Sequence, residues 1–454
     1  MARYSLQFKV AAFLLIVAML LGGGGSRFAF AEMLVQLAAI PALVLGLGDM
    51  RAAQNWAGFR TLIVICAAAA ALVLLQLVPL PPFIWQALPG RELWAEGANL
   101  IPGGATWLAW SVNPELTVQS GLSLMVPVAM ILSVMRLGEK EQRLLLYIAL
   151  AMLGVHLAVA VMQALSGGES FYPYKTSHKG LPLGLFANRN HMAELALMGI
   201  FVLIGLVSSK HGEGERGGRY LLLGTAILIL SLAIVATNSR TATALLIPAY
   251  MFLTYKALPV RWRKQSAWIL GGLSFSVAGL LAVMLSSGTF MLANTMAKRY
   301  AQDEDHRFEF WPDAWHAMLE YMPFGSGLGT FDTVFRANEK LTTVGSHYVN
   351  NAHNDYLELG IETGIFGLAI AAVFLFWFGK TLVILSRGQK TGSNIMGTYS
   401  GAALVAIALH SMIDYPLRSL SLAAVAALLV GVMAFCRGAS QVLPEHNPRR
   451  SNGD

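Results

Sequence analysis

Four ionisable side chains stand at the start of an apolar stretch, NNAHNDYLELGIETGIFGL, that covers residues 350–368. They are His353, Asp355, Glu358 and Glu362. The three carboxylates are spaced by three and then four positions, so they share one face of a helix. A histidine titrates near neutral pH and can accept a proton from a reacting hydroxyl group. The stretch therefore indicates acid–base chemistry at the mouth of a helix, and solvated polar decoration is the alternative.

Helix capping explains only part of this pattern. Asn354 and Asp355 suit an N-cap and a first turn, where they meet unpaired backbone N–H groups. Glu358 and Glu362 lie deeper, where a carboxylate facing lipid is costly, so each must face a polar interior or pair with an arginine. A metal site of His353 with these carboxylates would lack a second histidine at zinc-binding spacing. We therefore expect no metal and no cofactor.

Three arginines lie at or beside the ends of other apolar stretches. Arg189 opens one in LFANRNHMAELAL, Arg240 closes one in VATNSRTATALL, and Arg307 lies in DEDHRFEFWPDAW. A guanidinium group binds phosphate oxygens in bidentate fashion, so these residues indicate a phosphate-bearing substrate. Membrane anchoring, snorkelling to the interface and a surface ion pair are the respective alternatives. His191 and Glu194 share a helix face and could pair with each other.

Composition predicts an all-α polytopic membrane protein. The 454 residues are 56% hydrophobic and 13% charged, whereas soluble domains are about 25% charged. A membrane span needs about 20 apolar residues. About twelve stretches qualify by that measure, near 6–22, 30–48, 59–80, 117–135, 143–165, 191–209, 219–237, 241–258, 267–286, 356–379, 396–413 and 418–436.

The basic residues indicate how these spans cross the membrane. With the N-terminus inside, 20 of the 32 lysines and arginines fall on the cytoplasmic face and 12 on the outer face. This is the positive-inside bias, and it predicts that both termini are cytoplasmic. The distribution does not suggest a nucleic-acid partner. The first 31 residues also resemble a cleavable secretory signal, but the run Gly22–Gly25 favours a turn between two spans.

The chain is predicted to form one integral membrane domain over 1–436, with a polar cytoplasmic tail over 437–454. Three longer connections fall on the outer face, at 81–116, 166–190 and 287–352. The largest contains RFEFWPDAWHAMLEY, whose apolar residues recur near helical spacing. This predicts short helices that lie on or over the membrane.

The outer surface of a bacterial-type membrane limits the possible reactions, because no ATP or nucleotide sugar is available there. The glycines of GSGLGTF, residues 325–331, do not form a nucleotide-binding motif. A substrate must then carry its own activation, as a lipid-linked diphosphate sugar does. Its diphosphate needs positive charge as it departs, and the acceptor hydroxyl needs a base. Arginines and one histidine can supply both without a metal.

The stretch HNDYLELGIETGIFG resembles a signature of the bacterial O-antigen ligase and polymerase superfamily, His-Asn, nine residues, then Gly-x-x-Gly. His353, Asn354, Gly364 and Gly367 stand at the matching positions. FANRNHMAELAL, NSRTATALL and HRFEFWPDAWHAM…PFGSGLGTF also look like segments of that family, the last with Arg307, Trp311 and Pro323. The likeness covers most of residues 180–370. Ligases of this family often have Leu after Arg and three residues, whereas Leu245 follows Arg240 one residue later.

The resemblance implies a GT-C-like, metal-independent, inverting glycosyltransferase in the bacterial inner membrane, with its active site facing the periplasm. The donor would be a glycan on undecaprenyl diphosphate. The acceptor would be a sugar hydroxyl, on lipid A core for a ligase or on a lipid-linked glycan for a polymerase, and polysaccharide assembly proteins are conceivable partners. In this hypothesis His353 is the general base, and Arg240 and Arg307, with Arg189, bind the diphosphate. The supporting residues would be His191, Asn354, Asp355, Glu358 and Glu362.

Two other functions remain open from the sequence. A transporter or flippase of lipid-linked saccharides would be expected to carry polar residues through mid-membrane depth, often in broken helices. Most charges in this chain cluster near the outer ends of the spans instead. A non-catalytic partner in polysaccharide assembly is the third possibility.

Overall fold

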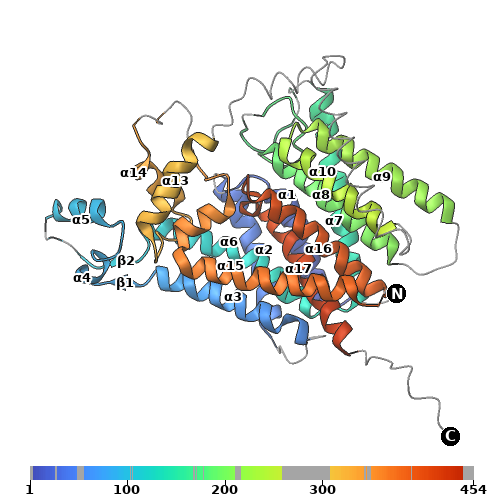
Figure 1. Ribbon diagram of the computed structural model, residues 1–454, viewed down its shortest axis with the longest axis horizontal. Coiled ribbons are helices and arrows are strands. Elements are labelled where there is room, and N and C mark those ends of the chain that lie inside the picture. The colour runs from blue at the N-terminus through green and yellow to red at the C-terminus, as the bar shows by residue number, and fades with distance from the viewer. Residues whose placement is uncertain are drawn as a thin grey trace, which may run out of the picture.

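The computed structural model describes most of the chain, and the statements below concern those residues. They are 4–25, 28–48, 56–102, 104, 106–166, 169, 171–176, 178–209, 216–257, 307–341, 344, 349–389 and 391–442. The long helices are α1 Leu6–Leu21, α2 Ala29–Leu47, α3 Trp56–Gln76, α6 Pro114–Met135, α7 Glu139–Leu165, α8 Arg189–Ser208, α9 Arg216–Ala236, α10 Arg240–Ala257, α15 Asp355–Arg387, α16 Gly392–His410 and α17 Leu420–Val442. They form an elongated bundle (Figure 1).

The prediction of an all-α polytopic membrane protein is confirmed. Each predicted span except 267–286, which lies outside the described residues, coincides with one of these helices. Among the described residues, eight helices are long and apolar enough to cross a membrane. The edges differ: α15 continues to Arg387 and α17 continues to Val442, past the predicted start of the tail at 437. Residues 443–454 of the tail lie outside the described residues.

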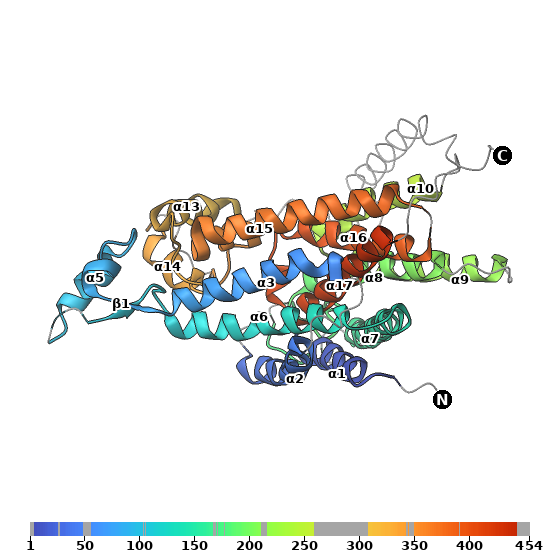
Figure 2. The same cartoon turned by 90° about the horizontal axis from the view of Figure 1, so that it is seen from below.

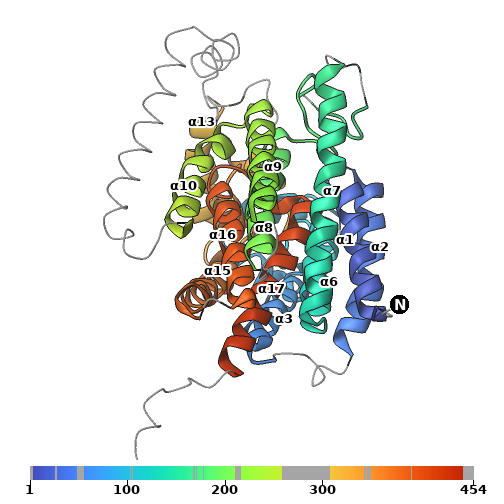
Figure 3. The ribbon, with the colours of Figure 1, turned by 90° about the vertical axis from the view of Figure 1, so that its right-hand side faces the viewer.

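Helix α17 is the centre of the bundle. It packs against α1, α3, α6 and α16 (Figure 3). Its most apolar window is 94% buried, as expected for a helix that is apolar on all sides. Helices α3 and α17 approach each other closely at Gly58 of α3, since a Cβ there would lie 2.0 Å from the carbonyl oxygen of Ala434 in α17. Small residues at helix contacts permit this packing without a hydrophobic driving force.

Helix α15 is kinked at Gly364, where φ is +58° and ψ is −149°. The left-handed conformation favours glycine, and a Cβ there would also lie 2.1 Å from the Pro323 carbonyl oxygen. The kink frees backbone groups for the segment before α14. The N–H of Ser326 donates to Ile361 O at 2.9 Å, and the N–H of Ile365 donates to Pro323 O at 2.9 Å. The kink thus joins the first turns of α15 to the segment between α13 and α14.

The short helices predicted in the largest loop are present as α13 Arg307–Tyr321 and α14 Phe331–Asn338. They pack with the start of α15 around a second apolar core, which includes Phe310, Tyr321, Phe331, Phe335 and Ile361. A smaller lobe precedes α6 and holds α4 Pro82–Trp85, α5 Glu92–Asn99 and the antiparallel strands β1 Pro79–Leu80 and β2 Leu108–Ala109. Both lobes lie at the same end of the bundle (Figure 2).

Candidate active site

His353 lies where α15 begins, beside the turn of residues 411–419 that joins α16 to α17. Its backbone φ is +49°, and Asn238 is the other non-glycine residue with positive φ among those described. Such a conformation is uncommon and tends to occur at functional sites. Its Nδ1 lies 3.2 Å from Oδ1 of Asp414, and its side chain is 27% exposed. One ring nitrogen therefore faces a buried carboxylate while the ring keeps access to solvent.

The backbone before His353 is held on both sides. The Ala352 N–H donates to Oε2 of Glu358 at 2.9 Å, and the Ala352 carbonyl accepts from the Trp311 indole N–H at 2.8 Å. After His353, the Asn354 side chain caps α15 by accepting from the N–H groups of Tyr356 and Leu357, each at 3.0 Å. These bonds fix the loop that presents the imidazole. The N-cap by Asn354 agrees with the sequence interpretation.

Asp414 is fully buried and was not singled out from the sequence. Its Oδ1 also accepts from the Tyr415 N–H at 2.9 Å, and its Oδ2 accepts from Nδ2 of Asn190. Burial raises the pKa of this carboxyl, but the hydrogen bond from His353 and the nearby imidazoles outweigh it and hold the pKa well below its usual value. Asp414 is therefore a carboxylate with each oxygen occupied by a donor.

Arg307, the first residue of α13, reaches the same turn. Its Nη1 donates to the carbonyl oxygen of Ile413, the residue before Asp414. The N–H of Asp355 donates to Ser411 O at 2.9 Å, which ties the start of α15 to the end of α16. The turn thus contacts both Arg307 of α13 and the start of α15, where His353 and Asp355 lie.

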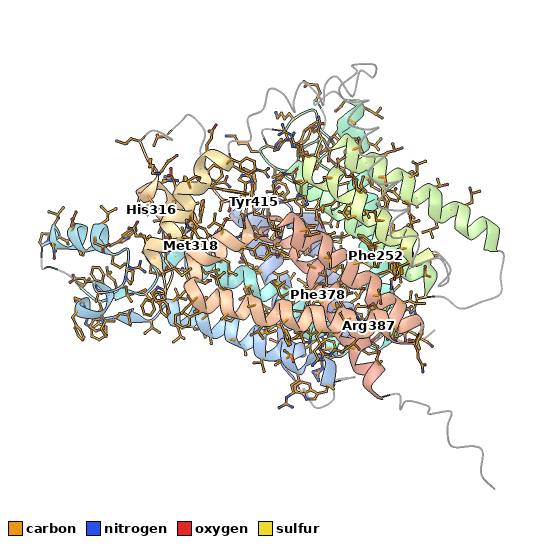
Figure 4. All side chains as sticks on the ribbon, in the orientation of Figure 1. Phe252, His316, Met318, Phe378, Arg387 and Tyr415 are labelled. Atoms are coloured by element: carbon orange, nitrogen blue, oxygen red, sulfur yellow. The ribbon has the colours of Figure 1, made fainter. Side chains whose placement is uncertain are left out.

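Two further histidines lie behind this turn. His191 of α8 meets the Tyr415 ring edge-on with centroids 5.5 Å apart, and His353 meets the same ring at 4.7 Å. Tyr415, which Figure 4 labels, therefore lies between the two imidazoles. The suggested pairing of His191 with Glu194 is wrong. Glu194 instead binds Nδ1 of His410 at 2.7 Å, both side chains being fully buried, because α8 packs against α16.

Glu358 and Glu362 do pair with an arginine, but it is Arg418 rather than one of the three predicted. Nη2 of Arg418 lies 3.0 Å from Glu358 Oε1 and 2.7 Å from Glu362 Oε2. Burial lowers the pKa of Arg418, but the two carboxylates outweigh it and raise that pKa above its usual value. The pair explains how two carboxylates are accommodated at this depth.

Arg189 and Arg240 are the first residues of α8 and α10. One antiparallel helix, α9, separates α8 from α10, so both begin at the same end of the bundle. The neighbour of Arg189, Asn190, contacts Asp414 directly, which places the start of α8 at the site. Helix α10 packs against α8 and α16. The structure thus sets Arg189 at the helix start that contacts the turn of residues 411–419, and Arg240 on a helix that packs against α8 and α16.

The residues missed from the sequence lie in one short segment and its surroundings. Residues 412–418, MIDYPLR, place an aspartate and an arginine in a short turn between two apolar stretches, and this pattern could have been recognised in the sequence. Asn190 carried no comparable signal, because an amide at a helix start is ordinary. Among the described residues, no three His, Cys, Asp or Glu side chains form a group that could hold a metal ion.

The family model described as O-antigen ligase matches residues 225–372. A search of the curated proteins found no match. The matched range includes the start of α10, α13, α14 and the first turns of α15. The resemblance drawn from the sequence motifs is confirmed at the level of this family.

Proposed function

We propose that this chain, whose residues 225–372 match the family model described as O-antigen ligase, moves a glycan from undecaprenyl diphosphate to a sugar hydroxyl on the periplasmic face of the bacterial inner membrane. One observation carries the proposal above all. A partly exposed imidazole, His353, is paired with a buried carboxylate, Asp414, and the guanidinium of Arg307 binds the adjoining carbonyl. These contacts with one turn support the assignment of His353 as a base and of Arg307 as a cation for a phosphate.

The geometry suggests how the base would work. Asp414 accepts a hydrogen bond from Nδ1 of His353, so the neutral ring carries its proton on that nitrogen and keeps the lone pair on Nε2. Nε2 then takes the proton of the acceptor hydroxyl as its oxygen forms a bond to the anomeric carbon of the donor. The carboxylate stabilises the imidazolium that results. Because the oxygen attacks as the old bond breaks, the anomeric configuration is inverted.

The leaving group is the diphosphate of the lipid carrier. The bond from the anomeric carbon to the diphosphate oxygen breaks, and its electron pair stays with that oxygen. Arg307, Arg240 and Arg189 would stabilise this negative charge, since guanidinium groups bind phosphate oxygens in parallel pairs of hydrogen bonds. No metal takes part in this proposal. The long apolar helices would keep the carrier lipid and the site in one membrane.

Ligase and polymerase differ only in the acceptor, which is lipid A core for a ligase and a second lipid-linked glycan for a polymerase. The helix bundle fits both, because either acceptor is anchored in a membrane. We propose cytoplasmic termini and a periplasmic site on the positive-inside distribution of basic residues. Polysaccharide assembly proteins are proposed partners for delivery or chain-length control.

Purified protein in lipid nanodiscs tests the proposal. With undecaprenyl-diphosphate-linked glycan and acceptor supplied together, we expect a transferred product and released undecaprenyl diphosphate. His353→Ala should abolish transfer without loss of folded protein, and Arg307→Lys should reduce it strongly because a point charge cannot replace the planar fork. If the wild-type protein moves the donor across the bilayer but forms no product, a flippase is the better assignment. Glycan profiling of a deletion strain separates ligase from polymerase, since unattached polymer indicates the first and single repeat units indicate the second.

A further inference from the structure

Asn190 occupies an unusual place in this cluster. It is the second residue of α8, directly after Arg189, and its side chain is buried. Its Nδ2 donates to Oδ2 of Asp414, which lies 224 residues away in the sequence. The amide thus connects the start of α8 to the carboxylate that holds His353.

The hydrogen bond from Asn190 gives the second oxygen of the buried Asp414 carboxylate a donor. Asp414 is fully buried, and its Oδ1 already accepts from His353 and from the Tyr415 N–H. Oδ2 accepts from Asn190. A buried carboxylate oxygen without a donor is strongly disfavoured, so loss of the amide would drive Asp414 to rotate toward another donor or to bind a proton. Either change would release Nδ1 of His353 from its present partner.

The first turn of α8 holds the amide in place. The Asn190 N–H donates to Oδ1 of Asn188 at 2.9 Å, which caps the helix. The Asp414 N–H donates to His410 O at 3.0 Å, at the end of α16, and α8 packs closely against α16. The donor is therefore held by α8, and the acceptor is held by a backbone hydrogen bond to the last residue of α16, against which α8 packs.

We propose that Asn190 is a positioning residue for the base: it orients Asp414 and thereby fixes the tautomer and direction of His353. The inference rests on the proposed glycosyl transfer, but it concerns a residue that touches neither substrate. Asn190 acts only through Asp414. A purely structural asparagine would lower the amount of folded protein instead, and a substrate-binding one would change KM.

A double-mutant cycle on the full-length protein in nanodiscs tests this relation. The reactions use undecaprenyl-diphosphate-linked glycan and acceptor, with kcat and KM measured separately. Asn190→Ala should lower kcat about 10- to 100-fold, the range expected when a hydrogen bond to a charged group is lost, and leave KM nearly unchanged. In an Asp414→Asn background the same change should have little further effect, because two residues that act as one unit are not additive.

Exchanging donor and acceptor gives a sharper readout. Asn190→Asp alone sets two carboxylates against each other and should be worse than Asn190→Ala. In the double variant Asn190→Asp/Asp414→Asn, an amide again meets a carboxylate, so its kcat should exceed the product of the two single effects by about tenfold or more. Asn338→Ala is the matched control. It removes a hydrogen bond that the Asn338 side-chain amide donates to Val334 O in α14, and it should leave kcat unchanged.

The outcomes distinguish this inference from the function on which it rests. If the wild-type protein forms no product under these conditions, the proposed function fails. If the wild-type protein is active, an Asn190→Ala variant within twofold of its kcat overturns the inference. Additive losses in the cycle, or a loss confined to KM, also overturn it.

Discussion

The charge of Asp414 should be needed for transfer, and Asp414→Asn tests that need with almost no change in shape. Oδ1 lies 3.2 Å from Nδ1 of His353. In the variant the amide oxygen can still accept from His353, since the Asn190 amide can turn to meet the new Nδ2. Only the negative charge is lost. A carboxylate in contact with an imidazolium stabilises it, and losing that stabilisation as the charge forms during transfer should raise the barrier by about 1.4 to 4 kcal/mol.

That free energy sets the size of the effect. As His353 takes the acceptor proton, the imidazolium of the variant lacks its counter-charge, so kcat should fall about 10- to 1000-fold. KM should change little, because Asp414 is buried and does not face the substrates. Transfer would be measured in nanodiscs with saturating donor and acceptor. Asp332→Asn is the control, since it removes a half-buried carboxylate that pairs with Arg336 in α14. A kcat for Asp414→Asn within twofold of the wild-type value would refute the base assignment.

Three further predictions concern stability. Arg418→Met leaves the buried carboxylates of Glu358 and Glu362 without a cation. This should cost about 3 to 5 kcal/mol of stability and lower the unfolding temperature in detergent. Adding Glu358→Gln and Glu362→Gln should restore most of the lost stability, and an unchanged unfolding temperature for the single variant would contradict the pairing. Gly364→Ala should prevent folding, as judged by size-exclusion chromatography, because φ is +58° and the Cβ would lie 2.1 Å from Pro323 O, whereas Gly154→Ala, with open space around it, should be tolerated. The pKa of Asp414 is lowered in the folded protein, so the ionised carboxylate should stabilise the fold fully above about pH 5 and progressively less as the pH falls below about 4. The difference in unfolding temperature between wild type and Asp414→Asn should therefore shrink as the pH falls below about 4. A difference that stays constant with pH would contradict this prediction.

The spans were predictable because each is an apolar stretch long enough to cross a membrane, a property that belongs to a local segment. The kink at Gly364 was not predictable in this way. The sequence shows Gly364 and Gly367 but not that the backbone near Gly364 meets Pro323 from the segment between α13 and α14. A left-handed glycine in the middle of an apolar run depends on what docks against it, and that is a property of the folded chain.

The site shows the same division. His353, Asn354, Asp355 and Arg307 lie at helix starts, where capping rules and charge make them visible in the sequence. Their partners do not follow from local rules: Asp414 lies 61 residues from His353, and Arg418 lies 56 residues from Glu362. The i, i+3 spacing of His191 and Glu194 suggested a pair, yet the carboxylate turns to His410, 216 residues away. Helix packing overrides a weak local pairing preference.

The arginines near this end of the bundle cannot be assigned from charge alone, because three of those that the structure describes already have partners within the protein. Arg336 pairs with Asp332, Arg418 lies between Glu358 and Glu362, and the buried Arg91 donates to the Trp110 carbonyl at 2.7 Å. Each of these has a structural partner that a phosphate would have to displace. Arg307 is tied to the turn that holds the base, since its guanidinium donates to the Ile413 carbonyl, one residue from Asp414. A diphosphate bound there would lie near the turn that holds the base. In the proposed displacement, the acceptor hydroxyl would give its proton to Nε2 of His353 on one side of the anomeric carbon, and the diphosphate would leave on the other side.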